Sequence, residues 1–231
     1  SSRFPGKPLV KILGKEMILW VAEISSKAVG ISNVFIATDD LRIENVVKEK
    51  GYNTILTDLD LLTGTDRVAQ ASEKLNYDIY INVQGDEPLV NPFDIRKAID
   101  LKIRYPKFVI NSFCPLGEKE IPTNKNIPKV IFKENKDLVY ISRAKIPDSK
   151  NKVENYIYQK QVCIYSYDKN QLSKFKSFGR KSKLEKIEDI EILRFLELGI
   201  NIKMFEASSS SLAVDIPSDV EAVESALLSK N

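Results

Sequence analysis

Residues 79–88, IYINVQGDEP, are the stretch that decides the fold: an apolar run that stops at a glycine, two carboxylates and a proline. The apolar side chains of residues 79–83 suit a strand that is covered on both faces, as in a parallel sheet of an α/β domain. The glycine lets the backbone turn, and the proline cannot continue the strand pairing. We therefore expect Asp86 and Glu87 at the carboxyl end of a central strand, where open α/β sheets bind their ligands.

Asp86 is a candidate metal ligand, because a hard carboxylate at such an edge suits Mg²⁺ together with phosphate groups. Asp215, in residues 214–217 (VDIP), is a second carboxylate beside a turn-forming proline. If both follow strands of one sheet, they meet at the same edge and can share one Mg²⁺. The alternative is that Asp86 lies in a solvated turn and that each aspartate only caps the following helix.

Composition describes an ordinary globular chain of 231 residues, with 43% hydrophobic and 29% charged residues, and we expect one domain with an appended lobe. The net charge of +3 comes from scattered lysines, which gives little support for nucleic-acid binding. The chain has no histidine and no CxxC motif, which argues against zinc and excludes Ser-His and Cys-His nucleophilic catalysis.

Cys114 and Cys163 lie in apolar, strand-like runs and are expected to be buried free thiols in a reducing compartment. No apolar run reaches transmembrane length, and no signal peptide is recognised. We therefore expect a cytoplasmic protein that is not inserted into a membrane.

The order of the predicted elements is strand, helix, strand, which is typical of an α/β fold. We expect helices over residues 16–28, 40–50, 65–75, 92–105, 184–198 and 218–228, and strands over residues 33–38, 53–57, 79–83, 108–113, 129–132, 138–141, 157–167 and 201–205. The pair 129–132 and 138–141 is joined by a polar turn and predicts a hairpin rather than a crossover. A mixed sheet or β-rich flap therefore lies between the α/β parts and is a place for an acceptor site or a dimer interface.

Residues 1–9, SSRFPGKPL, form a candidate phosphate cradle. Backbone N–H groups can approach oxygens closely at Gly6, and Arg3 and Lys7 supply positive charge. The spacing is not that of a Walker A loop, and a solvated terminus is the alternative. Because no strand precedes this loop, we expect the chain to begin inside a domain.

Residues 63–67, TGTDR, predict a helix start at which Thr65 caps the helix and Gly64 permits close approach of a ligand. Arg67 projects from the first turn, where its charge opposes the helix dipole unless an anionic or hydrogen-bonding partner is present. This makes Arg67 a functional candidate. Glu185, Glu188 and Asp189 form an acidic stripe on the later helix, which is either a solvated face or part of the site.

Six motifs together resemble the CMP-Kdo synthetases, the 3-deoxy-manno-octulosonate (Kdo) cytidylyltransferases. They occur in the family's order over nearly the whole chain, at residues 2–9 (SRFPGKPL), 64–67 (GTDR), 82–88 (NVQGDEP), 142–147 (SRAKIP), 184–194 and 214–217 (VDIP). Members of that family begin with a further strand and a phosphate loop that ends in an arginine. The resemblance therefore implies that the first strand is missing before residue 1.

The resemblance implies a Rossmann-like nucleotidyltransferase fold, a glycosyltransferase-A-like three-layer α/β sandwich with a mixed β-rich insertion. A nucleotide-binding core of about residues 1–115 and 200–231 would carry an acceptor-binding and dimerisation lobe of about residues 116–199. The implied reaction transfers a cytidylyl group from CTP to a 2-keto-3-deoxy sugar acid with Mg²⁺ and releases pyrophosphate. A cytoplasmic homodimer in lipopolysaccharide or capsule biosynthesis is the implied setting.

The resemblance also assigns site residues by position. The implied catalytic residues are Lys7, Asp86 and Asp215, with the two aspartates holding Mg²⁺. The implied nucleotide-binding residues are Arg3, Lys7, Gly64, Thr65, Arg67, Gln84 and Gly85. The implied acceptor-binding residues are Arg143, Gln161, Tyr165 and Glu188, with Arg143 as a clamp for the sugar carboxylate.

One departure from the family concerns the acceptor site. Residues 160–167 read KQVCIYSY where the family has RHLGIYGY, so Gln161 stands in place of a histidine. Asp189 and Ile192 also replace an apolar residue and a glutamine that are usual in the family's helix. The acceptor is therefore open between Kdo, its 8-amino analogue and another ulosonic acid.

Nucleotidyl transfer needs no protein nucleophile, because the acceptor hydroxyl attacks the α-phosphorus, so a site without histidine can perform it. Two alternatives remain open on the residues alone. One is a nucleotidyltransferase-like protein of the spore-coat-polysaccharide type, which shares the SxRLPGK start. The other is a non-catalytic nucleotide-binding or dimer-forming subunit.

Overall fold

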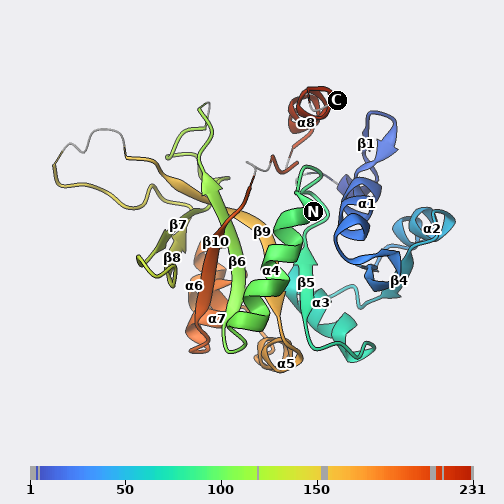
Figure 1. Ribbon diagram of the computed structural model, residues 1–231, viewed down its shortest axis with the longest axis horizontal. Helices are drawn as coiled ribbons and strands as arrows, with labels where there is room; N and C mark the ends of the chain where they lie inside the picture. The colour runs from blue at the N-terminus through green and yellow to red at the C-terminus, as the bar shows by residue number, and fades with distance from the viewer. Residues whose placement is uncertain are drawn as a thin grey trace.

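The computed structural model describes residues 4, 6–118, 120–151, 156–208, 212–214 and 216–229. Helices lie on both faces of a central sheet, and residues 143–151 and 156–158, between β8 (Leu138–Ser142) and β9 (Gln159–Tyr167), lead away from the body of the molecule (Figure 1). This arrangement is the three-layer α/β sandwich with a β-rich insertion that the resemblance implies.

The central sheet has the strand order β10-β6-β9-β7-β8, and β5 pairs with β9. Its strands are β5 (Tyr80–Val83), β6 (Val109–Pro115), β7 (Lys129–Phe132), β8 (Leu138–Ser142), β9 (Gln159–Tyr167) and β10 (Ile202–Glu206). Within this sheet, as far as the structure describes it, β10 and β6 form the only parallel pair, whereas β9 is antiparallel to β5, β6 and β7. Residues 79–83 were expected to lie in a parallel sheet, and this is wrong for the edge of β5 that pairs with β9. The hairpin β7–β8 reverses the chain before it returns as β9 beside β5.

A second sheet contains two parallel strands, β3 (Phe35–Thr38) and β4 (Asn53–Leu56), joined by α2 (Leu41–Glu49). The carboxylate of Asp40 caps α2 by accepting the backbone N–H of Arg42 at 2.8 Å. The expected strand, helix, strand order is confirmed here. A small hairpin, β1 (Lys11–Ile12) and β2 (Lys15–Glu16), precedes the first helix.

The helices form two layers, one on each face of the sheets. One layer holds α1 (Met17–Val29) and α4 (Pro92–Arg104), and the other holds α3 (Gly64–Glu73), α5 (Lys169–Ser177), α6 (Lys183–Glu188) and α7 (Leu193–Glu197). Two single 3₁₀ turns, Lys7–Leu9 and Ile31–Asn33, flank α1. The last helix, α8 (Asp219–Leu228), packs Val223 against the β1 and α1 region.

The helix expected over residues 184–198 is wrong as a single element, because α6 and α7 are separate. Asp189 ends α6 with φ 52° and ψ 49°, a left-handed conformation that interrupts the helical hydrogen bonds. The break changes which side chains are buried: Ile187 is 71% exposed, whereas Ile190 and Leu193 lie in the core.

Both cysteines are free, as expected, but only Cys114 is buried, and Cys163 is partly exposed. In the residues that the structure describes, no helix has the length and apolar character needed to cross a membrane.

Candidate active site

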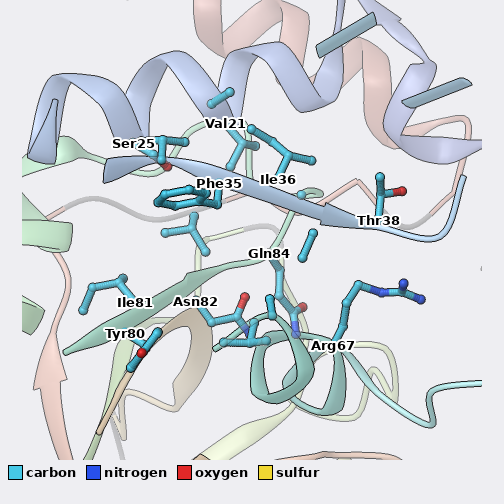
Figure 2. A pocket seen from close by; sticks show the side chains of 18 of the residues that line it. Val21, Ser25, Phe35, Ile36, Thr38, Arg67, Tyr80, Ile81, Asn82 and Gln84 are labelled. Atoms are coloured by element: carbon cyan, nitrogen blue, oxygen red, sulfur yellow. The ribbon is translucent and has the colours of Figure 1, made fainter. Parts of the chain in front are cut away.

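A cavity of about 860 Å³ lies between β3 and β5, with α1 on one side and α3 on the other. Figure 2 shows Phe35 and Ile36 of β3 across this cavity from Ile81 of β5. Its polar mouth gathers six residues that the sequence analysis singled out, namely Lys7, Gly64, Arg67, Gln84, Gly85 and Asp86. Three stretches that are far apart in the sequence therefore meet at one edge of the fold.

Lys7 and Asp86 form an ion pair at this mouth. Gly6, at φ 70°, allows the backbone to enter the 3₁₀ turn that begins at Lys7. The Lys7 Nζ lies 2.6 Å from Oδ2 of Asp86, and the two side chains are 10% and 21% exposed. The two residues expected to hold phosphates and metal are thus adjacent, and their charges compensate each other.

Arg3 and Asp215 lie outside the described residues, so their expected roles stay predictions. The neighbouring segment does reach the site: the backbone N–H of Val214 donates to the carbonyl oxygen of Asp86 at 2.9 Å. This hydrogen bond places residues 212–214 beside the loop after β5.

The donor chemistry at Asp86 fits Mg²⁺. Among the residues that the structure describes, no cluster of three or more His, Cys, Asp or Glu side chains forms a metal cage. Mg²⁺ is commonly held by only one or two carboxylates together with substrate phosphates, and a single partly exposed carboxylate beside a lysine agrees with that pattern.

Thr63 caps α3, so the expectation that Thr65 is the cap is wrong. The hydroxyl of Thr63 accepts the backbone N–H of Asp66 at 3.2 Å. Thr65 is instead fully buried; its backbone N–H donates to Oε2 of Glu191 at 2.9 Å, and its hydroxyl lies 3.2 Å from that of Tyr167. Thr65 therefore attaches the start of α3 to Glu191 and Tyr167 in the interior. Its contact with the nucleotide stays a prediction.

Arg67 has the anionic partner that its position in the first turn of α3 requires. Its Nη2 lies 3.1 Å from Oδ2 of Asp39, which follows β3, and its Nη1 donates to the hydroxyl of Thr57. These contacts hold the guanidinium at the mouth of the cavity (Figure 2). The arginine thereby links the ends of β3 and β4 to the start of α3.

Glu191 is a site residue that the sequence analysis missed. Its Oε1 accepts Nε2–H of Gln84 at 2.7 Å, and its Oε2 accepts Thr65. Withdrawal from water raises the pKa of the Glu191 carboxyl above its usual value. Glu191 lies outside the acidic stripe of Glu185, Glu188 and Asp189, and a continuous helix gave no reason to single it out. The helix break at Asp189 is what allows its side chain to reach Gln84.

Gln161 and Tyr165 lie on the same face of β9, with Cys163 between them. Nε2–H of Gln161 donates to Oδ1 of Asn111 at 3.0 Å, and the Nδ2 of Asn111 donates to two carbonyl oxygens of β9. Tyr165 is 2% exposed, and burial raises the pKa of its phenol well above the usual value. Their contact with an acceptor stays a prediction.

Arg143 and Glu188 form a separate cluster, and neither lines the cavity described above. The carboxylate of Glu188 accepts the hydroxyl of Ser142 at 2.6 Å and the backbone N–H of Arg143 at 2.9 Å. The Arg143 guanidinium donates to the carbonyl oxygens of Glu188, Asp189 and Lys125. The structure therefore gives both residues a role in joining the end of β8 to α6, and their acceptor role stays a prediction.

The sandwich, with the Lys7–Asp86 ion pair after the carboxyl end of β5, defines an α/β protein whose ligand site lies at a strand end. The sequence model of the family described as cytidylyltransferase matches residues 1–203. The chain belongs to the cytidylyltransferase family. The resemblance stated from the motifs, the fold class and the enzyme class are thereby confirmed.

Individual relatives agree over almost the whole chain. It is 40% identical over 236 residues to 3-deoxy-manno-octulosonate cytidylyltransferase 2 of Hydrogenovibrio crunogenus, covering 98% of this chain and 94% of the relative. It is 36% identical over 233 residues to 8-amino-3,8-dideoxy-manno-octulosonate cytidylyltransferase of Shewanella baltica, covering 98% and 94%.

A solved structure of CMP:2-keto-3-deoxy-manno-octonic acid synthetase complexed with CTP also resembles the chain. The two share a TM-score of 0.90 at 36% identity, over 100% of this chain and 95% of the other. At this identity the likeness extends beyond the fold to the family.

Proposed function

We propose that the protein transfers the cytidylyl group of CTP to a 2-keto-3-deoxy sugar acid, Kdo or a close analogue, and releases pyrophosphate. The observation that carries this proposal is the meeting of Lys7, Arg67, Gln84 and Asp86 at one cavity mouth. Similarity to relatives named for Kdo and for its 8-amino analogue supports the acceptor class.

In the proposed reaction, the acceptor's 2-hydroxyl oxygen forms a bond to the α-phosphorus of CTP. The bond from that phosphorus to the bridging oxygen breaks, and pyrophosphate leaves with the electron pair. The hydroxyl proton passes to water. The protein's part is to hold the two reactants in line and to compensate their negative charge.

Lys7 and Arg67 are the cations at the mouth that suit the triphosphate and the nucleotide. Asp86, together with Asp215, would hold Mg²⁺, which when bound neutralises phosphate charge. Gln84 offers its amide to the base, and Gln161 and Tyr165 on β9 are proposed to face the sugar acid.

We further propose that the protein acts as a cytoplasmic homodimer in lipopolysaccharide or capsule biosynthesis. The division into a nucleotide-binding core of about residues 1–115 and 200–231 and an acceptor and dimerisation lobe of about residues 116–199 is part of this proposal. Residues 143–151 and 156–158 of that lobe lead away from the sandwich (Figure 1), which suits contact with a second copy.

The test is pyrophosphate release with each of the four ribonucleoside triphosphates against Kdo, its 8-amino analogue and other ulosonic acids. We expect release with CTP and at least one of these acceptors. A matched Asp86→Asn variant, which keeps the side-chain shape and removes a charge, should lose at least about a hundredfold in kcat, comparable to the loss of a main electrostatic stabiliser. Binding of CTP without release on any acceptor would instead favour a non-catalytic nucleotide-binding subunit.

A further inference from the structure

Strand β9 carries a two-residue bulge in its pairing with β6. Asn111 of β6 lies opposite Tyr165, but the next residue, Ser112, lies opposite Val162. In the pairing that the structure describes, residues 163–164 of β9 therefore have no partner on β6. Bulges of this kind are common beside active sites, where they redirect side chains and backbone groups.

The bulge brings β9 into contact with the loop after β5. The backbone N–H of Cys163 donates to Oε1 of Glu87 at 3.2 Å, and the carbonyl oxygen of Cys163 accepts the backbone N–H of Gln84 at 3.3 Å. Asp86 lies between these two loop residues in the sequence and pairs with Lys7. A ligand bound on β9 next to the bulge therefore lies beside the loop that carries this ion pair.

The side chain of Asn111 fills the bulge in a single orientation. Its Nδ2 donates to the carbonyl oxygens of Val162 and Ile164, each at 3.0 Å, and Asn111 is fully buried. Carbonyl oxygens only accept hydrogen bonds, so exchanging the two ends of the Asn111 amide would place oxygen against oxygen in the interior. The Oδ1 of Asn111 therefore points away from these two carbonyl groups.

Asn111 in turn fixes the orientation of Gln161. The Oδ1 of Asn111 accepts Nε2–H of Gln161 at 3.0 Å. Because Oδ1 cannot donate a hydrogen bond, Gln161 must keep its NH₂ end toward Asn111. Gln161 is partly exposed, and no group among the residues that the structure describes donates a hydrogen bond to its Oε1. The strand therefore presents a carbonyl oxygen of fixed orientation beside the bulge.

We infer that Asn111 is a positioning residue for the acceptor, and that through Gln161 it selects an acceptor group that donates a hydrogen bond. This inference rests on the proposed function. A hydroxyl or ammonium group of the sugar acid suits the Oε1 of Gln161, whereas a carboxylate or keto oxygen would face it without a proton to share. The sugar acid is therefore bound at Gln161 through a hydroxyl or amino group and not through its carboxylate.

The test measures the dissociation constant of Kdo by titration calorimetry in the presence of CMP and Mg²⁺, which allow no pyrophosphate release. The variant is Asn111→Thr, which suits a strand and keeps one donor for the bulge, but its hydroxyl is one bond closer to the backbone than the amide oxygen that holds Gln161. We expect Kdo binding to weaken at least about fivefold, the net contribution of one hydrogen bond, and CMP binding to change less than about twofold.

Ser112→Ala is the matched control. The hydroxyl of Ser112 also donates to the Val162 carbonyl oxygen at 3.0 Å, but it does not contact Gln161. This variant should bind Kdo as the parent protein does. The same loss of Kdo binding in Ser112→Ala as in Asn111→Thr would overturn the inference, because the bulge alone would then explain the effect.

The chemistry of the selected group is tested with Kdo analogues that each have one hydroxyl replaced by hydrogen. In the parent protein, one analogue should bind at least about fivefold more weakly than Kdo, because Oε1 of Gln161 loses its donor. Asn111→Thr should bind that analogue and Kdo about equally. A parent protein that binds all these analogues as tightly as Kdo would contradict the selection of a donor group.

Unchanged Kdo binding in Asn111→Thr would also overturn the inference. If this variant does not fold, Gln161→Met decides: it keeps the side-chain length at a partly exposed position and removes the amide, so Kdo binding must weaken by the same factor. Kdo binding that follows the predicted pattern without pyrophosphate release from CTP would reject the proposed reaction and leave this inference standing. Pyrophosphate release with equal Kdo binding in every variant would do the reverse.

Discussion

The hydrogen bond from Gln84 to Glu191 fixes which atom the glutamine presents to a ligand. An ionised carboxylate only accepts hydrogen bonds, so Nε2–H of Gln84 faces Glu191 and its Oε1 is left for the mouth of the cavity. A carbonyl oxygen at that place complements the 4-amino group of cytosine and opposes the 4-carbonyl of uracil. Glu191 is therefore a positioning residue for base choice in the proposed reaction.

Glu191→Gln should weaken the preference for CTP over UTP by about tenfold or more, equivalent to about 1.4 kcal/mol. The new amide can donate to Gln84 and let it turn, so that either end of Gln84 faces the base. The measurement is kcat/KM for both nucleotides with one acceptor. Glu197→Gln, the same change on an exposed side chain of α7, is the control, and an unchanged CTP to UTP ratio in the Glu191 variant would contradict the assignment.

The raised pKa of Glu191 also predicts how stability depends on pH. The pKa of the Glu191 carboxyl is 4.5 in the unfolded chain and higher in the folded protein. At a pH between the unfolded and the folded pKa, the folded protein therefore binds more protons than the unfolded chain. The contribution of this group to the free energy of unfolding is largest below pH 4.5 and falls as pH rises through the folded pKa. Urea unfolding measures the free energy of unfolding of Glu191→Gln and of the parent protein. The value for the variant minus that for the parent should increase with pH between the unfolded and the folded pKa, and then become constant. A flat difference would mean that the carboxyl has an ordinary pKa.

At the scale of elements, the break between α6 and α7 could not be predicted from residues 184–198. Their apolar spacing fits one helix, and neither glycine nor proline interrupts it. Tertiary contacts select the left-handed Asp189: Lys181 Nζ lies 2.9 Å from its carboxylate, and Arg143 donates to its carbonyl oxygen. The helical propensity of residues 184–198 was overridden by contacts with Lys181 and Arg143, which lie outside this segment.

Asp189→Val should destabilise the protein by about 1–3 kcal/mol, because a β-branched residue is strained in the left-handed region. Asp189→Gly is the matched variant: it also loses the Lys181 contact but accepts the backbone conformation without strain. Urea denaturation should separate the two, with valine the less stable. Equal stabilities would show that backbone strain at this position is not what matters.

Arg194 joins the helices on one face of the sheet through a buried ion triad. Its Nη1 lies 2.7 Å from Oδ1 of Asp66 on α3, its Nη2 lies 2.6 Å from Oε1 of Glu185 on α6, and its guanidinium stacks 3.7 Å from the Phe175 ring centre. Arg194→Met should cost about 3–5 kcal/mol, because two buried carboxylates lose their counter-charge. Chemical denaturation measures this loss. Arg180→Met, at an exposed site, is the control, and a loss in Arg194→Met as small as the control's would contradict the triad's role.

For the whole molecule, the sequence predicted where the site lies better than how its side chains pair. Strand ends and helix starts are readable from local patterns, and they bring Lys7, Gly64, Arg67, Gln84 and Asp86 to one edge. The pairings of Lys7 with Asp86 and of Gln84 with Glu191 join residues 79 and 107 positions apart. No local pattern encodes which partner a side chain meets over such separations.

The division into two sheets predicts uneven stability across the molecule. The pair β3–β4 is held to the rest by helices across a cavity, whereas β6 and β9 form the centre of the larger sheet. Amides of residues 35–38 should therefore exchange at least about tenfold faster than those of residues 109–114, a gap of about 1.4 kcal/mol in opening free energy. Amide hydrogen exchange of the protein, followed at both sets of residues, measures the ratio of these rates. Equal rates would mean that both sheets open as one unit.

Because Lys7 and Asp86 form an ion pair at the mouth, a charged ligand that binds either residue competes with the other residue of the pair. In the free protein the ammonium group is the counter-ion of the carboxylate. A phosphate that binds Lys7 weakens the pairing of Lys7 with Asp86, and a cation that binds Asp86 weakens the attraction of that carboxylate for Lys7. In the proposed reaction, each ligand therefore prepares the position of the other, and by thermodynamic reciprocity triphosphate and divalent cation must strengthen one another's binding. If Asp86 holds Mg²⁺ as proposed, a nucleotide without metal would be repelled by this carboxylate, and the site would bind the metal-bound form of the same nucleotide more tightly.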